Sequence, residues 1–118
     1  MKKYFKKLAA LCVTAYANKI YSQATALAEG KYLEHPDMYF VITDPANPKG
    51  LMCINKDQFL DLRHRYHIPS KALTIQTLKN QCWYHTLSKT GLDGMTKEDI
   101  EVRMAAFRKM LLEKAKLV

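Results

Sequence analysis

The sequence lacks the short motifs that mark the common catalytic and phosphate-binding sites. It contains no Gly-x-Ser-x-Gly turn and no glycine-rich phosphate loop, and no base is placed by spacing beside its cysteines. Acidic residues are few, and Asp57, Glu98 and Asp99 fall in expected first turns of helices, where they oppose the helix dipole. We therefore expect a protein that is not an enzyme, with no cofactor and no small-molecule substrate.

Long apolar runs are also missing, and cysteine is scarce. No run reaches the roughly eighteen apolar residues that a membrane-spanning helix needs, so we expect no membrane span. The three cysteines, Cys12, Cys53 and Cys82, are odd in number and lie far apart within apolar patterns. Such cysteines are typical of buried free thiols in a reducing compartment, not of a disulfide framework.

The beginning of the sequence leaves a secretory signal peptide open as a minority alternative. Residues 1–7 resemble a basic n-region, residues 8–13 a short apolar segment, and residues 15–17 a small-residue cleavage site. The helical pattern, however, continues past that site to Leu27. We therefore expect this segment to remain part of the folded protein.

The charge of the chain is strongly positive. Nineteen lysines and arginines against eleven acidic residues give a net charge of +8 at pH 7. The excess is distributed, with six basic against two acidic residues in 1–34, five against two in 56–80, and six against four in 96–118. This balance favours an anionic partner, such as nucleic acid, an anionic membrane surface or an acidic protein.

Four lysines, Lys2, Lys3, Lys6 and Lys7, open a pattern that predicts a long basic amphipathic helix over residues 1–30. The glycine that closes this range is expected to stop the helix. The main apolar stripe of the helix consists of Phe5, Leu8, Cys12, Tyr16, Ile20 and Leu27. Either the rest of the chain or a partner must cover this stripe.

The next segment, residues 38–54, reads as a β-hairpin. Two runs rich in strand-forming residues, 38–43 and 51–54, flank a Pro/Asn/Gly turn at 44–50. Because a lone hairpin is only marginally stable in water, one of its faces must pack against a helix. The first helix is the expected neighbour.

Residues 56–116 are expected to form three helices. Asn55 is a good N-cap, with Gln58 in the capping-box position, while Thr74 and Thr96 are placed to cap the second and third helices. The inner face of the second of these helices is expected to contain Ile75, Leu78, Cys82 and His85. The sequence thus predicts one α+β domain over residues 1–118: a long N-terminal helix packed on a two-stranded β-hairpin, followed by three helices.

A nucleic-acid interface is one candidate site. Residues 59–81 read as helix, short turn and helix, which is similar to a helix-turn-helix. The expected nucleic-acid or anion contacts are Arg63, Arg65, Lys71 and Lys79, together with the four lysines of the first helix. Base-edge contacts are expected from Gln76, Asn80 and Gln81.

A protein interface is the second candidate. Tyr4, Leu11 and Tyr21 lie beside the main stripe of the first helix and widen its apolar surface. Trp83 and Tyr84 are adjacent on an expected helix, so at least one of the two rings must point away from its inner face. These five residues are the expected protein contacts. The alternative is that the first or last helix of the same chain covers them.

Two His and Cys pairs raise the question of a metal site. His64 and His67 are three residues apart, as are Cys82 and His85, and two such pairs can supply four ligands to zinc. The pairs lie on different helices, and Cys82 occupies a position of the expected core. We therefore expect a buried thiol with polar histidines and no metal.

The order of these features resembles a loosely defined group of uncharacterised small basic proteins from phages and integrative elements of Bacteroides-type bacteria. The matching segments are Met38–Val41, Gly50–Met52, Asn55–Leu60 and Leu78–Thr86. The resemblance implies a phage or mobile-element setting. It implies no biochemical activity. We expect a non-enzymatic binding or assembly protein, such as a virion component, whose partners are other protein subunits. The expected location is the bacterial cytoplasm or the virion, and the alternative function is soluble DNA or RNA binding.

Overall fold

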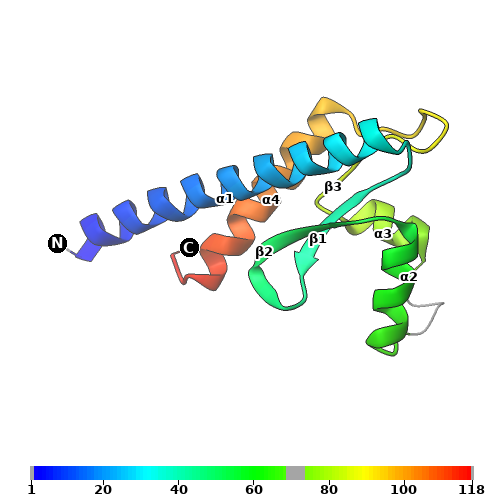
Figure 1. Ribbon diagram of the computed structural model, residues 1–118. Coiled ribbons are helices and arrows are strands. Elements are labelled where there is room, and N and C mark those ends of the chain that lie inside the picture. The colour runs from blue at the N-terminus through cyan, green and yellow to red at the C-terminus, as the bar shows by residue number, and fades with distance from the viewer. Residues whose placement is uncertain (1, 69–73, 118) are drawn as a thin grey trace.

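The computed structural model describes residues 2–68 and 74–117 of the chain (Figure 1). Within these ranges the chain forms four helices and one three-stranded antiparallel sheet, an α+β fold. In chain order the elements are α1 (Lys2–Glu34), β1 (Phe40–Asp44), β2 (Asn47–Ile54), α2 (Lys56–Arg65), α3 (Ile75–Gln81), β3 (Tyr84–His85) and α4 (Lys97–Lys114).

The sheet separates two layers of helices. Alternate side chains of a strand point to opposite faces, so Val41 and Cys53 lie on one face while Phe40 and Ile54 lie on the other. The first face packs against Ala24 and Ala28 of α1. The second face packs against residues of α2 and α3, namely Phe59 and Leu78. The predicted packing of the long first helix on the hairpin is confirmed.

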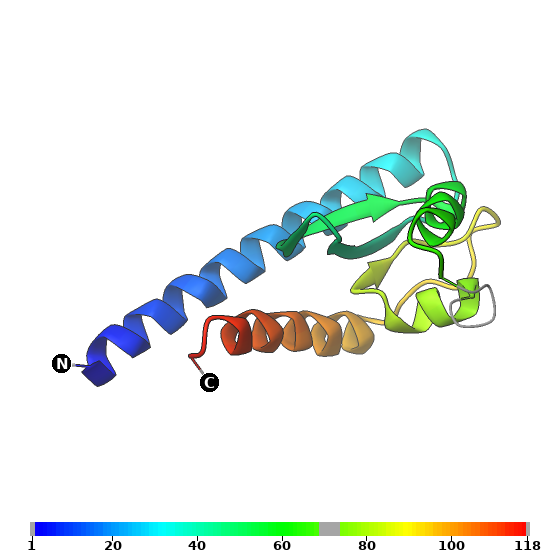
Figure 2. The same cartoon turned by 90° about the horizontal axis from the view of Figure 1, so that it is seen from below.

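The helix α4 lies along α1 and completes the first layer (Figure 2). Their contact is a third core cluster that contains Ala17, Tyr21, Phe107 and Leu111. The last helix of the chain therefore packs beside the first. This packing gives α1 two neighbours, the sheet and α4, along the part of the helix that follows Val13.

The side of α1 that packs on the body differs from the predicted stripe. Its buried residues are Ala17, Tyr21, Ala24 and Ala28, and three of these four are alanines, which allow the helix to approach its neighbours closely. Of the predicted stripe, the side chains of Phe5, Leu8, Cys12, Tyr16 and Leu27 are exposed. The prediction left open whether the chain or a partner covers this stripe, and the structure shows that the chain leaves most of it exposed.

The end of α1 also differs from the prediction. The helix continues through Gly30 and ends at Glu34, two residues before Pro36, which cannot continue a helix. Gly30 keeps a negative φ, so it does not form the left-handed cap that the prediction assumed. Tyr32 packs against the cluster around Val41, which holds the additional turn on the sheet.

The hairpin turn is tighter than predicted. β2 begins at Asn47, so only Pro45 and Ala46 separate the two strands, and the backbone N–H of Ala46 donates to Asp44 Oδ1 at 2.9 Å. The register pairs Phe40 with Ile54 and Thr43 with Leu51, with an irregularity between Thr43 and Asp44. The three predicted N-caps are confirmed, and the capping box of α2 joins Asn55 and Gln58 by two hydrogen bonds of 2.9 Å.

The third strand was predicted as helix, and this prediction is wrong. α3 ends at Gln81, and Cys82 adopts an extended conformation as its C-cap. The chain then runs beside β1, where Trp83 N–H donates to the Val41 carbonyl at 2.9 Å and Thr86 N–H donates to the Tyr39 carbonyl at 3.0 Å. Aromatic residues fit the pleated surface of a sheet well. Pairing with β1 gives the backbone groups of this segment their hydrogen-bond partners, so the segment does not need to continue α3.

Candidate binding surfaces

The beginning of α1 extends beyond the rest of the molecule (Figures 1 and 2). A helix of 33 residues is about 50 Å long, close to the 53 Å longest dimension of the described chain. The contact between α4 and α1 ends toward the N-terminus near Val13, where Leu111 and Ala115 border a hollow together with Cys12. Residues 2–12, which we call the projecting end of α1, therefore lie outside the core.

One side of the projecting end is apolar and open to solvent. The side chains of Phe5 and Leu11 are 66% and 65% exposed, and those of Leu8 and Cys12 are exposed as well. With 3.6 residues per turn, these four residues fall on one side of the helix. We call them the outer apolar row. Single exposed apolar residues are common on protein surfaces, but a contiguous row on one helix side marks an interaction surface.

Lys6 lies on the side of the projecting end opposite the outer apolar row, and Lys7 lies at the border of that row, next to Leu11. Lys6 and Lys7 are exposed, and the helical spacing that places Ala17 and Tyr21 on the core leads back through Ala10 to Lys6. No acidic residue precedes Glu29 in the sequence. The projecting end is thus a basic helix with one apolar side. The side chains of Lys2, Lys3 and Tyr4 lie outside the described part of the chain.

Tyr21 was predicted as a protein contact but lies inside the chain. Its side chain is 2% exposed, its ring centroid is 6.0 Å from that of Phe107, and its hydroxyl donates to the Trp83 carbonyl at 2.5 Å. Burial raises the pKa of Tyr21 to about 12, with a smaller opposing effect from the Arg103 charge. Tyr21 therefore joins α1 to α4 and β3 as a neutral phenol.

Trp83 and Tyr84 are also covered largely by their own chain, as the alternative prediction had it. The indole N–H of Trp83 donates to Thr43 Oγ1 at 3.0 Å, and its ring meets Phe107 edge-on at 5.3 Å. The hydroxyl of Tyr84 donates to the Glu29 carboxylate. Burial, followed by this hydrogen bond and charge, raises the pKa of Tyr84. Of the five predicted contacts, Leu11 is the described residue that remains well exposed.

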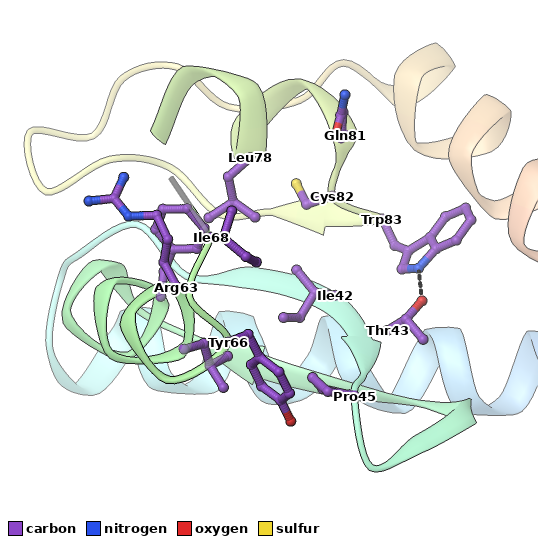
Figure 3. A pocket seen from close by; sticks show the side chains of 12 residues that line it. Ile42, Thr43, Pro45, Arg63, Tyr66, Ile68, Leu78, Gln81, Cys82 and Trp83 are labelled. Carbon is purple, nitrogen blue, oxygen red and sulfur yellow. Dashed lines mark hydrogen bonds between the residues drawn. The ribbon is translucent and has the colours of Figure 1, made fainter. Parts of the chain in front are cut away.

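A second candidate surface is an apolar groove of about 320 Å³ between α2, β1 and α3 (Figure 3). Its walls include Ile42, Phe59, Leu62, Tyr66, Leu78 and Trp83. The guanidinium of Arg63 lies over the Phe59 ring, with 5.7 Å between its central carbon and the ring centroid. Gln81 adds an amide to the groove lining. The groove is therefore mainly apolar, with few polar groups to orient a ligand.

The cations predicted for nucleic-acid binding fall into two separate groups. Lys6 and Lys7 lie at the projecting end, whereas Arg63, Arg65 and Lys79 lie on α2 and α3, at the other end of the molecule (Figure 1). Lys79 Nζ lies 3.7 Å from Asp93 Oδ1, and this ion pair makes the Lys79 ammonium less available to a phosphate.

The remaining parts of the predicted helix-turn-helix are limited. Lys71 lies outside the described residues. α3, which takes the place of the recognition helix, has seven residues, and two of its predicted base contacts, Gln76 and Asn80, hydrogen-bond to each other at 3.3 Å. The two groups of cations do not form one continuous basic surface.

The two His and Cys pairs of the sequence, His64 with His67 and Cys82 with His85, do not form a cluster of possible metal ligands in the described part of the chain. Among residues 2–68 and 74–117, no three His, Cys, Asp or Glu side chains come together in a way that could hold a metal ion. Cys82 is buried, its Sγ lies 3.5 Å from the Lys79 carbonyl, and burial raises the pKa of its thiol. His85 is buried as well, its Nδ1 lies 3.0 Å from the Thr86 carbonyl, and burial lowers its pKa.

Arg103 is a structural residue that the sequence reasoning missed. Its Nη1 donates to the carbonyls of Lys79 at 3.1 Å and of Cys82 at 2.8 Å. These carbonyls lie at the end of α3, where a helix leaves backbone acceptors without internal partners. Arg103 stands three residues after Ile100 and four before Phe107, on the inner side of α4. A basic residue at an inner position was the available signal.

Comparisons with protein-family models, curated proteins and solved structures find no match to this chain. Within the described ranges, none of the helices combines the length and apolar character needed to cross a membrane.

Proposed function

We propose that this chain is a non-enzymatic binding or assembly protein that attaches to its partner through the projecting end of α1. The observation that carries the proposal is the outer apolar row, in which Phe5 and Leu11 are each about two-thirds exposed on a helix that leaves the body. An apolar row on one side of a helix is expected to have a neighbour that covers it. Further along α1 the buried residues have the sheet and α4 as their neighbours, whereas the outer apolar row needs another molecule.

The setting that fits this proposal is a phage or mobile element, with the protein serving as a structural component of a larger assembly. The sequence resemblance is the support for this setting. The bacterial cytoplasm, where the parts of such an assembly are made, keeps thiols reduced, which suits three free thiols, two of which are buried. The apolar groove between α2 and α3 offers a second contact surface to such an assembly.

Soluble DNA or RNA binding through residues 59–81 is the alternative proposal. Its support is the net charge of +8 and the exposed Arg65 on α2. Phosphate contacts, however, make no use of the outer apolar row, which stays in water in that arrangement. The attachment proposal accounts for both the lysines and the apolar residues of the projecting end.

The test compares Leu11→Asp with Val102→Asp in cells that encode the protein. The two side chains are matched, since they are 65% and 68% exposed and both lie on helices. After lysis and high-speed sedimentation, we expect the wild type and Val102→Asp to pellet with the partner. We expect Leu11→Asp to lose about tenfold or more of the pelleted fraction, because a charge in the apolar contact removes an interface residue.

Nuclease treatment of the lysate separates the two proposals. Retention in the pellet after nuclease supports attachment through the outer apolar row. Release of the wild type by nuclease, with Leu11→Asp and Val102→Asp behaving alike, contradicts attachment and supports nucleic-acid binding.

A further inference from the structure

The distribution of charge at the projecting end narrows the chemistry of its partner. The sequence places five lysines and no acidic residue before Glu29, and four of these lysines lie within the first seven residues. Lys6, Lys7 and Lys19 are exposed. A second copy of this chain brings an equally basic segment, so its approach along the outer apolar row is opposed by like charges. The partner surface must therefore be anionic as well as apolar.

The two kinds of side chain divide the same turns between them. Phe5, Leu8 and Leu11 fall on one side, Lys6 falls on the opposite side, and Lys7 lies at the border, next to Leu11. A helix that lies in the plane of a lipid interface has this arrangement, with a basic polar face and an apolar face carrying Phe and Leu. The apolar side enters the boundary of the acyl chains, and the lysine side chains reach back to the headgroup phosphates.

The shape of the molecule permits such an arrangement. The sheet and α4 pack on the alanine side of α1, so the body lies away from the outer apolar row. The beginning of α1 also extends clear of the body (Figures 1 and 2). A broad, nearly flat surface can therefore meet the outer apolar row without touching the rest of the chain, and no groove has to enclose the helix.

We infer that the partner of the projecting end is an anionic lipid surface, on which residues 2–12 lie with the outer apolar row inserted and the lysines at the headgroups. This inference rests on the proposed function, since it names the partner of the same site. The protein is held at the surface without crossing it. Each lysine near an anionic surface adds about fivefold to the affinity, and the apolar row adds a contribution that salt does not screen.

The experiment uses purified full-length chain and vesicles of phosphatidylcholine, with or without half phosphatidylglycerol. We expect the chain to sediment with the anionic vesicles and to remain in solution with phosphatidylcholine alone. Leu11→Asp is expected to lose about tenfold or more in affinity, and Val102→Asp to bind as the wild type does. Lys6→Gln combined with Lys7→Gln should weaken binding by about fivefold for each lysine.

Lys89→Gln combined with Lys109→Gln removes the same charge from exposed positions outside α1 and is expected to leave binding nearly unchanged.

Cys12 supplies a direct readout of insertion. It is exposed, whereas Cys53 and Cys82 are buried, so a polarity-sensitive thiol dye attaches to the outer apolar row. We expect its emission to shift to the blue when anionic vesicles are added.

Three outcomes overturn the lipid inference. The first is that the wild-type chain does not sediment with anionic vesicles. The second is that the chain binds but the emission of the dye on Cys12 does not shift. The third is that the chain self-associates without vesicles and that Leu11→Asp abolishes this self-association. If Leu11→Asp is lost from the pellet of the cell lysate but the purified wild-type chain does not bind vesicles, the attachment proposal stands and the partner is a protein. If neither experiment distinguishes Leu11→Asp from Val102→Asp, the attachment proposal falls as well.

Discussion

Replacing Phe107 with alanine is expected to lower the free energy of unfolding by about 3–5 kcal/mol. Phe107 is fully buried at the point where three elements meet. Its ring lies 6.0 Å from the Tyr21 ring of α1 and 5.3 Å from the Trp83 ring that precedes β3. Since a small domain has a total stability of about 5–15 kcal/mol, this single change removes a large part of it.

Urea unfolding monitored by the fluorescence of Trp83, the single tryptophan of the chain, provides the measurement. Val102→Ala, on the exposed side of the same helix, is the matched control and should change the free energy by less than about 0.5 kcal/mol. A loss below about 1 kcal/mol for Phe107→Ala would mean that α4 does not pack on α1 as described.

Replacing Arg103 with methionine is the second large expected effect, a loss of about 2–3 kcal/mol. Methionine keeps much of the length and apolar volume of the side chain but donates no hydrogen bond. The carbonyls of Lys79 and Cys82 then lose the charged donor that now lies 3.1 and 2.8 Å away. Both carbonyls lie where α3 passes into the third strand. We therefore expect the backbone hydrogen bonds at this connection to open more readily in Arg103→Met than those elsewhere in the chain.

Arg108→Met is the control for Arg103→Met, because the Arg108 guanidinium donates to the side chain of Asn18 at 3.2 Å instead of to the backbone. We expect a loss of less than about 1 kcal/mol for this control. Hydrogen exchange adds a local readout, in which the amides of α3 should exchange faster in Arg103→Met alone. Equal exchange and equal stability in the two variants would show that Arg103 does not hold the end of α3.

Features encoded by neighbouring residues were the predictable part of the fold. The capping box of Asn55 and Gln58 spans one turn, and the hairpin joins two runs that a short turn separates. The third strand was not predictable in the same way. Tyr84 and His85 are extended because they pair with Val41 and Phe40, more than forty residues earlier, and no local pattern distinguishes them from the end of a helix.

The side of α1 that packs on the body could not be predicted from the sequence. Lys6, Lys7 and Leu11 were named from the sequence and are exposed in the structure. For the stripe containing Phe5 and Leu8, the sequence left open whether the chain itself or a partner covers it. The body packs instead on a side that consists mainly of alanines, which carry little hydrophobic signal, and the outer apolar row stays exposed.

Thiol labelling of the folded chain tests most directly whether α1 folds through its alanine side and keeps its outer apolar row open. We predict that a maleimide reagent modifies one cysteine per chain under native conditions, and that peptide mapping identifies it as Cys12. Cys53, buried between the sheet and α1, and Cys82, buried in the cluster on the other face of the sheet, should react only after unfolding. Protection of Cys12 in a monomeric chain, or equally fast labelling of Cys53, would contradict this arrangement.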